Sequence, residues 1–468
     1  MSLFFLSVFF LSLSIIAFAG PPNIVLIFID DMGWGDFSCF GNQHAKTPHI
    51  DRLAKEGLRF DHFYVNSPIC SPSRVAISTG QYPQRWKISS YLSNRDHNRK
   101  RGIAQWLDPQ APMLARSLKE GGYATGHFGK WHMGGQRNVN DAPPISDYGF
   151  EESLCNFEGM GPKLLPLTLK PGQTPARPNR LWEHGGILGK GARWMLRSKI
   201  TEGFVNEAIS FIEKAKNESK LFYLNLWPDD VHTPFWPPVD QWRDGSKRQL
   251  YLSVLEEMDR QLGKLIDHIR NDPTLTDNTL ILACSDNGPE KGAGVTGPFR
   301  GYKTHLFEGG IRSPLVAWAP SLIHKKAQGT RNKDSIFSAI DLVPTLLDIT
   351  GIKAPGNTDF DGESLPDILL GKSHTSREQD LFFRRPPDRD SFYGVKDLPD
   401  LAIRSGKWKL LCEYDGSNPL LYDLSQDPGE KINLASTHLN KVKELSRKVR
   451  DWHHSMPPDN GPKMATKN

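Results

Sequence analysis

Acidic and amide side chains stand together at two places in this 468-residue sequence where an apolar run ends. Asp30 and Asp31 close one run, and Asp286 and Asn287 follow another. Carboxylate and amide oxygens are ligands for Ca²⁺ or Mg²⁺, whereas zinc sites use Cys and His sets that these positions lack. The alternative for either pair alone is that its side chains cap a following helix or turn. Together the four residues predict an oxygen-rich cation site.

Basic and imidazole side chains follow two further apolar runs. Lys130 and His132 come after one run, and His232 comes after the other. Ligand sites in open α/β sheets lie beyond the carboxyl ends of the strands, so four strand ends would bring these residues and the acids to one edge. A single histidine is more often structural than catalytic, but two histidines at such an edge suit proton transfer.

A cysteine opens the pentapeptide Cys70-Ser71-Pro72-Ser73-Arg74. One interpretation is a buried cysteine in a turn before a helix, and another is a thiol nucleophile with one of the two histidines as its base. Neither explains a hard cation site nearby. The odd number of cysteines and the lack of a CxxC pair exclude a disulfide scaffold and a zinc ribbon. The five cysteines are Cys39, Cys70, Cys155, Cys284 and Cys412.

The apolar runs that precede these residues alternate with segments of helical spacing. This alternation predicts an α/β fold with a mostly parallel central sheet flanked by helices. The expected strands are 23–30, 123–128, 221–227 and 279–284, and the expected helices are 48–56, 113–120, 202–216 and 250–269.

Two regions depart from this alternation. The segment 134–198 is rich in Gly and Pro without clear periodicity, so we expect a long surface excursion that shapes a substrate cleft. The sequence pattern changes again after Gly371, where a small C-terminal α+β subdomain with an antiparallel sheet is expected. Its predicted strands are 401–411 and 420–424, and its predicted closing helix is 439–452.

Composition describes an ordinary folded protein, with 24% charged and 38% hydrophobic residues. A net charge of +5 permits a small anionic ligand and does not call for nucleic acid. Residues 1–19 have the apolar core and the small-x-small ending of a signal peptide, and no other segment looks membrane-spanning. We therefore expect an exported protein, periplasmic or secreted, with a catalytic domain at 20–371 and a C-terminal subdomain at 372–468.

These motifs together resemble the type I, formylglycine-dependent sulfatases, in the style of the arylsulfatase A and N-acetylgalactosamine-6-sulfatase group. The resemblance runs from Asn23 to about Leu434, with the motifs in the family's order, and its signature motif is Cys70-x-Pro72-x-Arg74. The further matching segments are Ser78-Thr79-Gly80, Gly122-Tyr123-Ala124-Thr125, Gly129-Lys130-Trp131-His132-Met133-Gly134, Asp286-Asn287-Gly288, Gly301-Tyr302-Lys303, Phe307-Glu308-Gly309-Gly310, Ile403-Arg404 and Leu421-Tyr422-Asp423-Leu424.

The resemblance implies an alkaline-phosphatase-like fold and a sulfuric ester hydrolase acting on a sulfated small molecule or glycan. It also implies a partner during maturation, the formylglycine-generating enzyme, which oxidises the cysteine. The implied Ca²⁺ ligands are Asp30, Asp31, Asp286, Asn287 and the modified Cys70, and the implied catalytic residues are Cys70, Arg74, Lys130, His132, His232 and Lys303.

The hydrolysis of a sulfate ester explains why these residue types would be needed. Cationic side chains and Ca²⁺ would neutralise charge on the non-bridging oxygens. One hydroxyl of the formylglycine hydrate would attack sulfur, and loss of a proton from the other would then release sulfate. By family analogy His132 is the base for that release, and His232, with Lys303, would protonate the departing alcohol oxygen.

Three features outside the motifs have open interpretations. Asp229 and Asp230 either shape a substrate subsite or belong to a solvated turn, which is favoured for Asp230. The basic run 95–101 fits a solvated loop better than a rim that attracts a polyanion. Arg384 and Arg385 could reach the same cleft.

Two other functions compete with the sulfatase hypothesis. A phosphatase, phosphodiesterase or phosphonate hydrolase could share the fold and differ in the group transferred. A protein that binds sulfated glycans without catalysis could keep the pocket alone, although every position of the catalytic type is filled.

Overall fold

The computed structural model describes residues 20–135, 142–178, 192–356, 358–388 and 398–460. The predicted signal peptide at 1–19 lies outside these ranges. Among the described residues, no helix has the length and apolar character needed to cross a bilayer.

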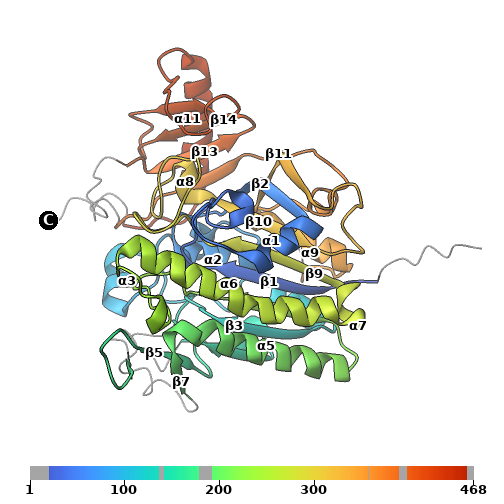
Figure 1. Ribbon diagram of the computed structural model, residues 1–468. Coiled ribbons are helices and arrows are strands. Elements are labelled where there is room, and N and C mark those ends of the chain that lie inside the picture. The colour runs from blue at the N-terminus through green and yellow to red at the C-terminus, as the bar shows by residue number, and fades with distance from the viewer. Residues whose placement is uncertain (1–19, 136–141, 179–191, 357, 389–397, 461–468) are drawn as a thin grey trace, which may run out of the picture.

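An eight-stranded sheet forms the centre of the molecule (Figure 1). Only β10 runs antiparallel to its neighbours β2 and β9, and the other neighbouring strands are parallel. The expectation of a mostly parallel sheet is therefore confirmed. In spatial order the strands are β11 (Thr330–Ser338), β2 (Leu58–Tyr64), β10 (Arg312–Trp318), β9 (Thr279–Ser285), β1 (Asn23–Ile29), β8 (Phe222–Trp227), β3 (Ala124–Gly129) and β4 (Glu152–Cys155).

Both faces of the central strand β1 are buried, which explains its continuous apolar sequence. Ile24, Leu26 and Phe28 pack into one hydrophobic cluster, while Val25, Ile27 and Ile29 pack into another. The first cluster includes residues of α2 (Cys70–Thr79), α4 (Leu114–Glu120) and α9 (Ala339–Thr350). The second includes residues of α1 (Pro48–Glu56), α5 (Ile200–Asn217) and α6 (Lys247–Asn271), so helices cover both faces.

The predicted helices of this body are all present. Helix α1 has the predicted bounds, with Pro48 at its first position and Gly57 directly after its end. Helix α6 extends past the predicted 250–269 at both ends, because apolar spacing marks only the buried part of a helix.

The described residues of the segment 134–198 form more regular structure than the sequence indicated. Strand β4 joins the edge of the main sheet. A separate small sheet contains β5 (Leu164–Thr168), β6 (Arg177–Pro178) and β7 (Arg193–Leu196), in which β5 and β7 are parallel. Strands β4, β5 and β7 are too short to show periodicity, and β4 and β7 pair with strands far along the chain, so the local sequence did not predict them.

The C-terminal part forms a four-stranded antiparallel sheet with the closing helix α11 (Leu439–Ser455), as expected. The predicted strand 401–411 is in fact a hairpin that turns at Gly406. The strand at 381–384 was not predicted. The four strands are β12 (Leu381–Arg384), β13 (Leu401–Ser405), β14 (Trp408–Cys412) and β15 (Leu420–Asp423).

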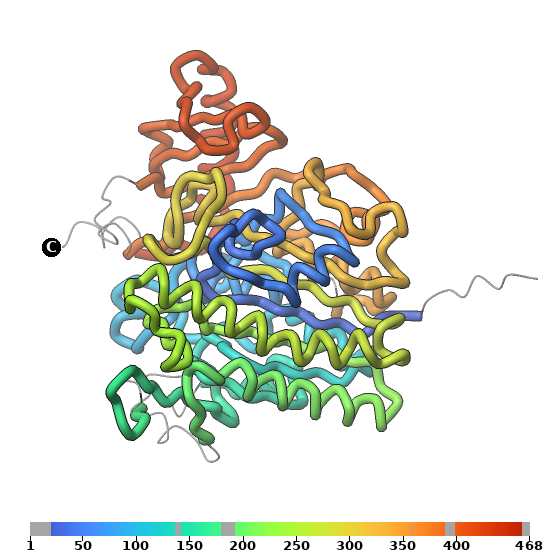
Figure 2. Tube along the Cα trace, in the orientation of Figure 1, coloured from blue at the N-terminus to red at the C-terminus, as the bar shows by residue number. Residues whose placement is uncertain are grey.

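Helix α8 (Glu308–Ile311) lies between this subdomain and the main body (Figure 2). The carboxylate of Glu308 accepts hydrogen bonds from Lys409 of β14 at 2.9 Å and from Tyr64 of β2 at 2.7 Å. The backbone amide of Glu308 donates to Glu430 at 2.7 Å. A buried polar contact thus ties the C-terminal sheet to the segment that carries Lys303.

Candidate active site

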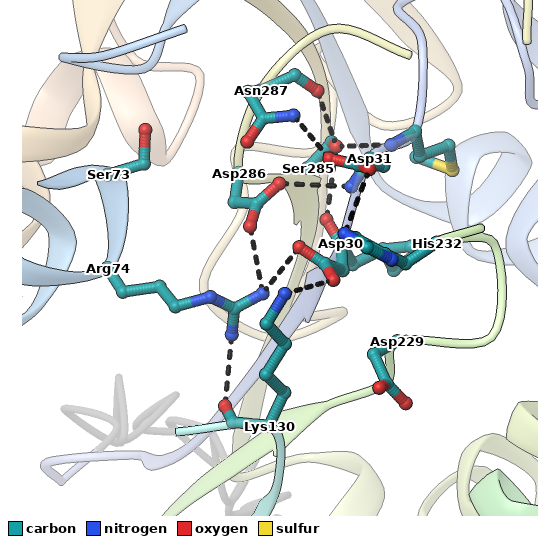
Figure 3. Close-up of polar contacts among 12 residues, drawn as sticks. Asp30, Asp31, Ser73, Arg74, Lys130, Asp229, His232, Ser285, Asp286 and Asn287 are labelled. Carbon is teal, nitrogen blue, oxygen red and sulfur yellow. Dashed lines mark hydrogen bonds and ion pairs between the residues drawn. The ribbon is translucent and has the colours of Figure 1, made fainter. Parts of the chain in front are cut away.

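The predicted site residues gather where the parallel strands end (Figure 3). Two acids follow β1, the Asp286 and Asn287 pair follows β9, Lys130 and His132 follow β3, and His232 lies in the loop after β8. Cys70 and Arg74 lie on α2, and Lys303 lies in the loop before α8. Strands β9, β1, β8 and β3 are parallel neighbours, so their carboxyl ends share one edge.

Three carboxylates form the centre of the site. One oxygen from each of Asp30, Asp31 and Asp286 lies within 4.8 Å of the others, and all three residues are fully buried. The Asp31 amide donates to Asp286 Oδ1 at 3.0 Å, and Asn287 Nδ2 donates to Asp31 Oδ1 at 2.8 Å. The other amide atom, Asn287 Oδ1, is buried with no hydrogen-bond partner among the described residues. Because no neighbouring donor binds this oxygen, it is available as a ligand for a cation.

Arg74 bridges two of the carboxylates. Its Nη2 donates to Asp30 Oδ1 at 3.1 Å and to Asp286 Oδ2 at 2.8 Å, while its Nη1 donates to the carbonyl of Lys130 at 3.0 Å. The guanidinium is fully buried and lies 5.3 Å from the centroid of the Trp227 ring. Arg74 thereby fixes the ends of β1, β9 and β3 relative to one another.

Two lysines complete the charge balance of the site. Lys130 Nζ lies 2.5 Å from Asp30 Oδ2, and Lys303 Nζ lies 2.5 Å from Asp31 Oδ2. With Arg74, three cationic side chains face three carboxylates. A divalent cation added to this cluster would give it a positive charge, which suits an anionic group.

Burial and neighbouring charges shift the pKa values of Asp30 and Asp286 in opposite directions. Burial alone would raise the pKa of Asp30, but the charges of Lys130, His232 and Arg74 outweigh it and hold this pKa well below its usual range. Burial and the nearby charge of Asp30 raise the pKa of Asp286 well above its usual range. Carboxylates held this close repel one another, and a cation among them relieves that repulsion.

Cys70 is the first residue of α2 and is buried, whereas the sequence had suggested a turn before the helix. Its Sγ lies within 4.8 Å of a carboxylate oxygen of Asp30 and a ring nitrogen of His232. Burial, followed by the charge of Asp30, raises the pKa of the Cys70 thiol to about 12. The unmodified side chain is therefore protonated at neutral pH, which disfavours a thiolate nucleophile.

His232 lies on the open side of the site. Its side chain is 33% exposed, whereas the side chain of Asp31 is fully buried. His232 Nδ1 lies 2.7 Å from the carbonyl of Thr233, which can only accept, so Nδ1 carries a proton. His232 Nε2 then faces Asp31 Oδ2 at 3.5 Å and Lys303 Nζ at 3.3 Å. Burial and the charge of Lys303 lower the pKa of His232.

His132 is held by the segment that precedes α3 (Arg95–Arg101). Its Nε2 lies 3.1 Å from the carbonyl of Leu92, so Nε2 is the donor and Nδ1 carries the lone pair of the neutral ring. The Leu92 amide donates to Ser71 Oγ at 2.9 Å. His132 is thus tied to the residue next to Cys70, and its ring packs edge-on against Phe157 at 4.7 Å.

The expected solvated turn at Asp230 is wrong. Asp229 and Asp230 are both 4% exposed. Asp229 Oδ1 accepts from Arg197 Nη1 at 2.5 Å and from Asn156 Nδ2 at 2.8 Å, and Asp230 accepts from the Thr201 hydroxyl. Sequence reasoning missed these three donors. The signal that could have found them is the pair of adjacent acids after a buried strand, which requires a counter-charge.

The basic run 95–101 is helix α3 (Arg95–Arg101), not a loop. Arg99 is exposed and pairs with Asp96, whereas the buried Arg101 lies 3.1 Å from Asp388.

Arg384 and Arg385 make their described ion pairs within the C-terminal subdomain. Arg384 pairs with Asp459 at 3.3 Å and Arg385 with Asp400 at 2.8 Å. A reach into the cleft stays a prediction for both.

The main mixed sheet, its flanking helices and the small C-terminal antiparallel sheet are those of the alkaline-phosphatase-like fold. Residues 22–352 match the Sulfatase family model, and residues 299–454 match the model of the N-sulphoglucosamine sulphohydrolase C-terminal region. The chain therefore belongs to the sulfatase family, and it is a sulfuric ester hydrolase.

Individual relatives agree with this assignment. N-acetylgalactosamine-6-sulfatase of Canis lupus familiaris is 30% identical over 94% of this chain and 87% of its own length. Arylsulfatase A of Homo sapiens is 32% identical over 90% of this chain and 84% of its own length. The crystal structure of Ps i-CgsB in complex with k-i-k-neocarrahexaose superposes with a TM-score of 0.75 at 27% identity, covering 93% of this chain and 94% of that one.

Proposed function

We propose that the protein hydrolyses sulfate esters of carbohydrates, using one Ca²⁺ ion and a formylglycine derived from Cys70. The observation that carries this proposal is the meeting of Cys70 with Asp30 and His232, whose ligand atoms lie within 4.8 Å of one another beside the acid cluster. This juxtaposition supports the proposal, because Cys70 lies next to carboxylate oxygens that could bind a cation and next to an imidazole that could transfer a proton.

The donor set supports Ca²⁺ because it consists of carboxylate and amide oxygens, including the unused Asn287 Oδ1. When bound, Ca²⁺ would polarise a sulfate oxygen, and the formylglycine hydrate would supply the nucleophilic hydroxyl. The proposed ligands are Asp30, Asp31, Asp286, Asn287 and the modified Cys70.

Cationic side chains of the chain itself are proposed to bind the sulfate group. Lys130 and Lys303 can turn their ammonium groups toward sulfate oxygens once the acids serve a cation. Arg74 lies on the same helix as Cys70 and joins this helix to Asp30, Asp286 and the Lys130 carbonyl through its three hydrogen bonds. These groups stabilise the charge that develops on the non-bridging oxygens.

The histidines are proposed to move the two protons of the reaction. His132 Nδ1 takes the proton whose loss releases sulfate, since His132 Nε2 is committed to Leu92. His232 Nε2 carries the lone pair of the neutral ring and lies 3.3 Å from the ammonium of Lys303, so Lys303 can pass a proton through Nε2 to the departing alcohol oxygen. The partial exposure of His232 supports this role, because the alcohol must leave toward solvent.

A sulfated carbohydrate is the proposed substrate. The support is the 30% identical N-acetylgalactosamine-6-sulfatase and the similar structure that holds k-i-k-neocarrahexaose. We further propose export, supported by the signal-peptide pattern at 1–19, and maturation by a formylglycine-generating enzyme.

Mass spectrometry of the peptide that contains Cys70 tests the mechanism. Conversion of the thiol to an aldehyde lowers the peptide mass by about 18 daltons, through loss of H₂S and gain of oxygen. Turnover of nitrophenyl sulfate and nitrophenyl phosphate is then compared with the same preparation. An unmodified Cys70 in active protein contradicts the formylglycine mechanism, and a strong preference for phosphate contradicts sulfate ester hydrolysis.

A further inference from the structure

A buried polar cluster directly behind His232 has no part in the functions assigned so far. Asp229 and Asp230 follow β8 and precede His232 by three and two residues. Figure 3 shows Asp229 at the end of this strand and His232 beside Asp30. Two adjacent carboxylates buried at 4% exposure are costly unless the fold uses them, because an apolar pair would pack at lower cost.

Arg197 binds Asp229 at two points. Its Nη1 donates to Asp229 Oδ1 at 2.5 Å, and its Nη2 donates to the Asp229 carbonyl. Both side chains are 5% exposed, so solvent screens this ion pair little. The planar, forked guanidinium can hold a carboxylate and a carbonyl together, which a lysine cannot do.

The same Asp229 carbonyl connects the Arg197 hydrogen bonds to His232. It accepts the His232 backbone amide at 3.1 Å and closes a tight turn from 229 to 232. Arg197 therefore sets the position of the backbone from which the His232 ring extends toward Asp31 and Lys303.

Two further donors fix the turn from other elements. Asn156, just after β4, donates to Asp229 Oδ1 at 2.8 Å, and Thr201 in the first turn of α5 donates its hydroxyl to Asp230. The positive end of the α5 dipole also favours a carboxylate at this place. The turn is thus held from three segments of the chain.

We infer that Arg197 is a positioning residue for His232, acting through Asp229 to aim His232 Nε2 at the departing alcohol oxygen. This inference rests on the proposed function, in which His232 delivers the proton to the leaving group. It explains why the β8 loop is anchored by buried charges at the one point where the ring must be placed within a fraction of an ångström.

The test uses two leaving groups that differ in their need for a proton. Nitrophenolate leaves nitrophenyl sulfate without protonation, whereas a sugar alkoxide needs a general acid. Arg197→Lys should lower kcat for a sulfated sugar by roughly tenfold or more and kcat for nitrophenyl sulfate by less than about threefold, with KM little changed. Asp229→Asn, which keeps an acceptor for Asn156, is the second variant should Arg197→Lys fold poorly.

A matched control and a double variant separate positioning from stability. Arg377 is a buried arginine that binds Glu363 at 3.3 Å, away from the site, and Arg377→Lys should leave the ratio of the two kcat values unchanged. His232→Gln should show the same leaving-group pattern as Arg197→Lys. Adding Arg197→Lys to His232→Gln should cause no further loss on the sulfated sugar.

Equal losses on both substrates, or additive losses in the double variant, overturn the inference and leave the proposed function standing. If the wild-type protein with modified Cys70 cleaves no sulfate ester, the proposed function fails and the inference fails with it.

Discussion

Replacing Arg74 by lysine should lower catalysis by about two orders of magnitude. The guanidinium makes three hydrogen bonds, to Asp30, Asp286 and the carbonyl of Lys130, at full burial. A lysine keeps the charge but can maintain one of these bonds with good geometry. Loss of two charge-assisted hydrogen bonds at about 1.5 kcal/mol each gives about 3 kcal/mol, or roughly 100-fold in rate if the whole loss falls on the transition state.

The assay is kcat/KM for nitrophenyl sulfate, divided by the fraction of Cys70 converted to formylglycine. Mass spectrometry supplies that fraction, which is needed because Arg74 lies in the motif around Cys70. Arg377→Lys serves as the control for a conservative change at a buried arginine. If kcat/KM falls by less than about fivefold after this correction, Arg74 does not fix the relative positions of the three strand ends as inferred.

Three further outcomes are expected. Asn287→Leu should weaken Ca²⁺ binding in calorimetry while leaving the far-ultraviolet circular dichroism unchanged, and equal affinity would exclude Asn287 as a ligand. Lys409→Met should lower the free energy of unfolding in urea by about 3 kcal/mol or more, because Glu308 and Glu430 lose their shared buried cation; a change below about 1 kcal/mol would argue against that pairing. Burial raises the pKa of Asp259 to about 7, so the folded state holds a proton that the unfolded chain releases, and stability falls as pH rises from about 4 to 7. Asp259→Asn should reduce this slope by up to about 1.4 kcal/mol per pH unit, and an unchanged slope of thermal unfolding against pH would contradict the assignment.

Residues at the ends of buried strands could be predicted from the sequence because two signals coincide there. A strand buried on both faces appears as an unbroken apolar run, as in β1, and its polar successors stand out. The motif around Cys70 then assigned chemistry to the edge that these strands define. The metal-type and cationic residues accordingly lie together in the structure.

Contacts between distant segments were not predictable in this way. Arg197 reaches Asp229 across 32 residues, and no local pattern links the two. Asp230 was assigned to solvent because two adjacent acids are usually exposed, and its burial depends on Thr201. The same limit applies to β5 and β7, whose pairing spans a segment without periodicity.

The deep burial of Cys70 limits the time during protein synthesis in which the proposed oxidation of its thiol can occur. In the finished fold Cys70 is 2% exposed, and its helix α2 packs into a cluster with α9, which begins at Ala339. Strand β1 likewise cannot complete its pairing until β8 and β9 have been synthesised. At typical elongation rates the roughly 270 residues between Cys70 and α9 take about 10–50 s to synthesise. The enzyme proposed to oxidise Cys70 would therefore have to act before the chain closes around this residue.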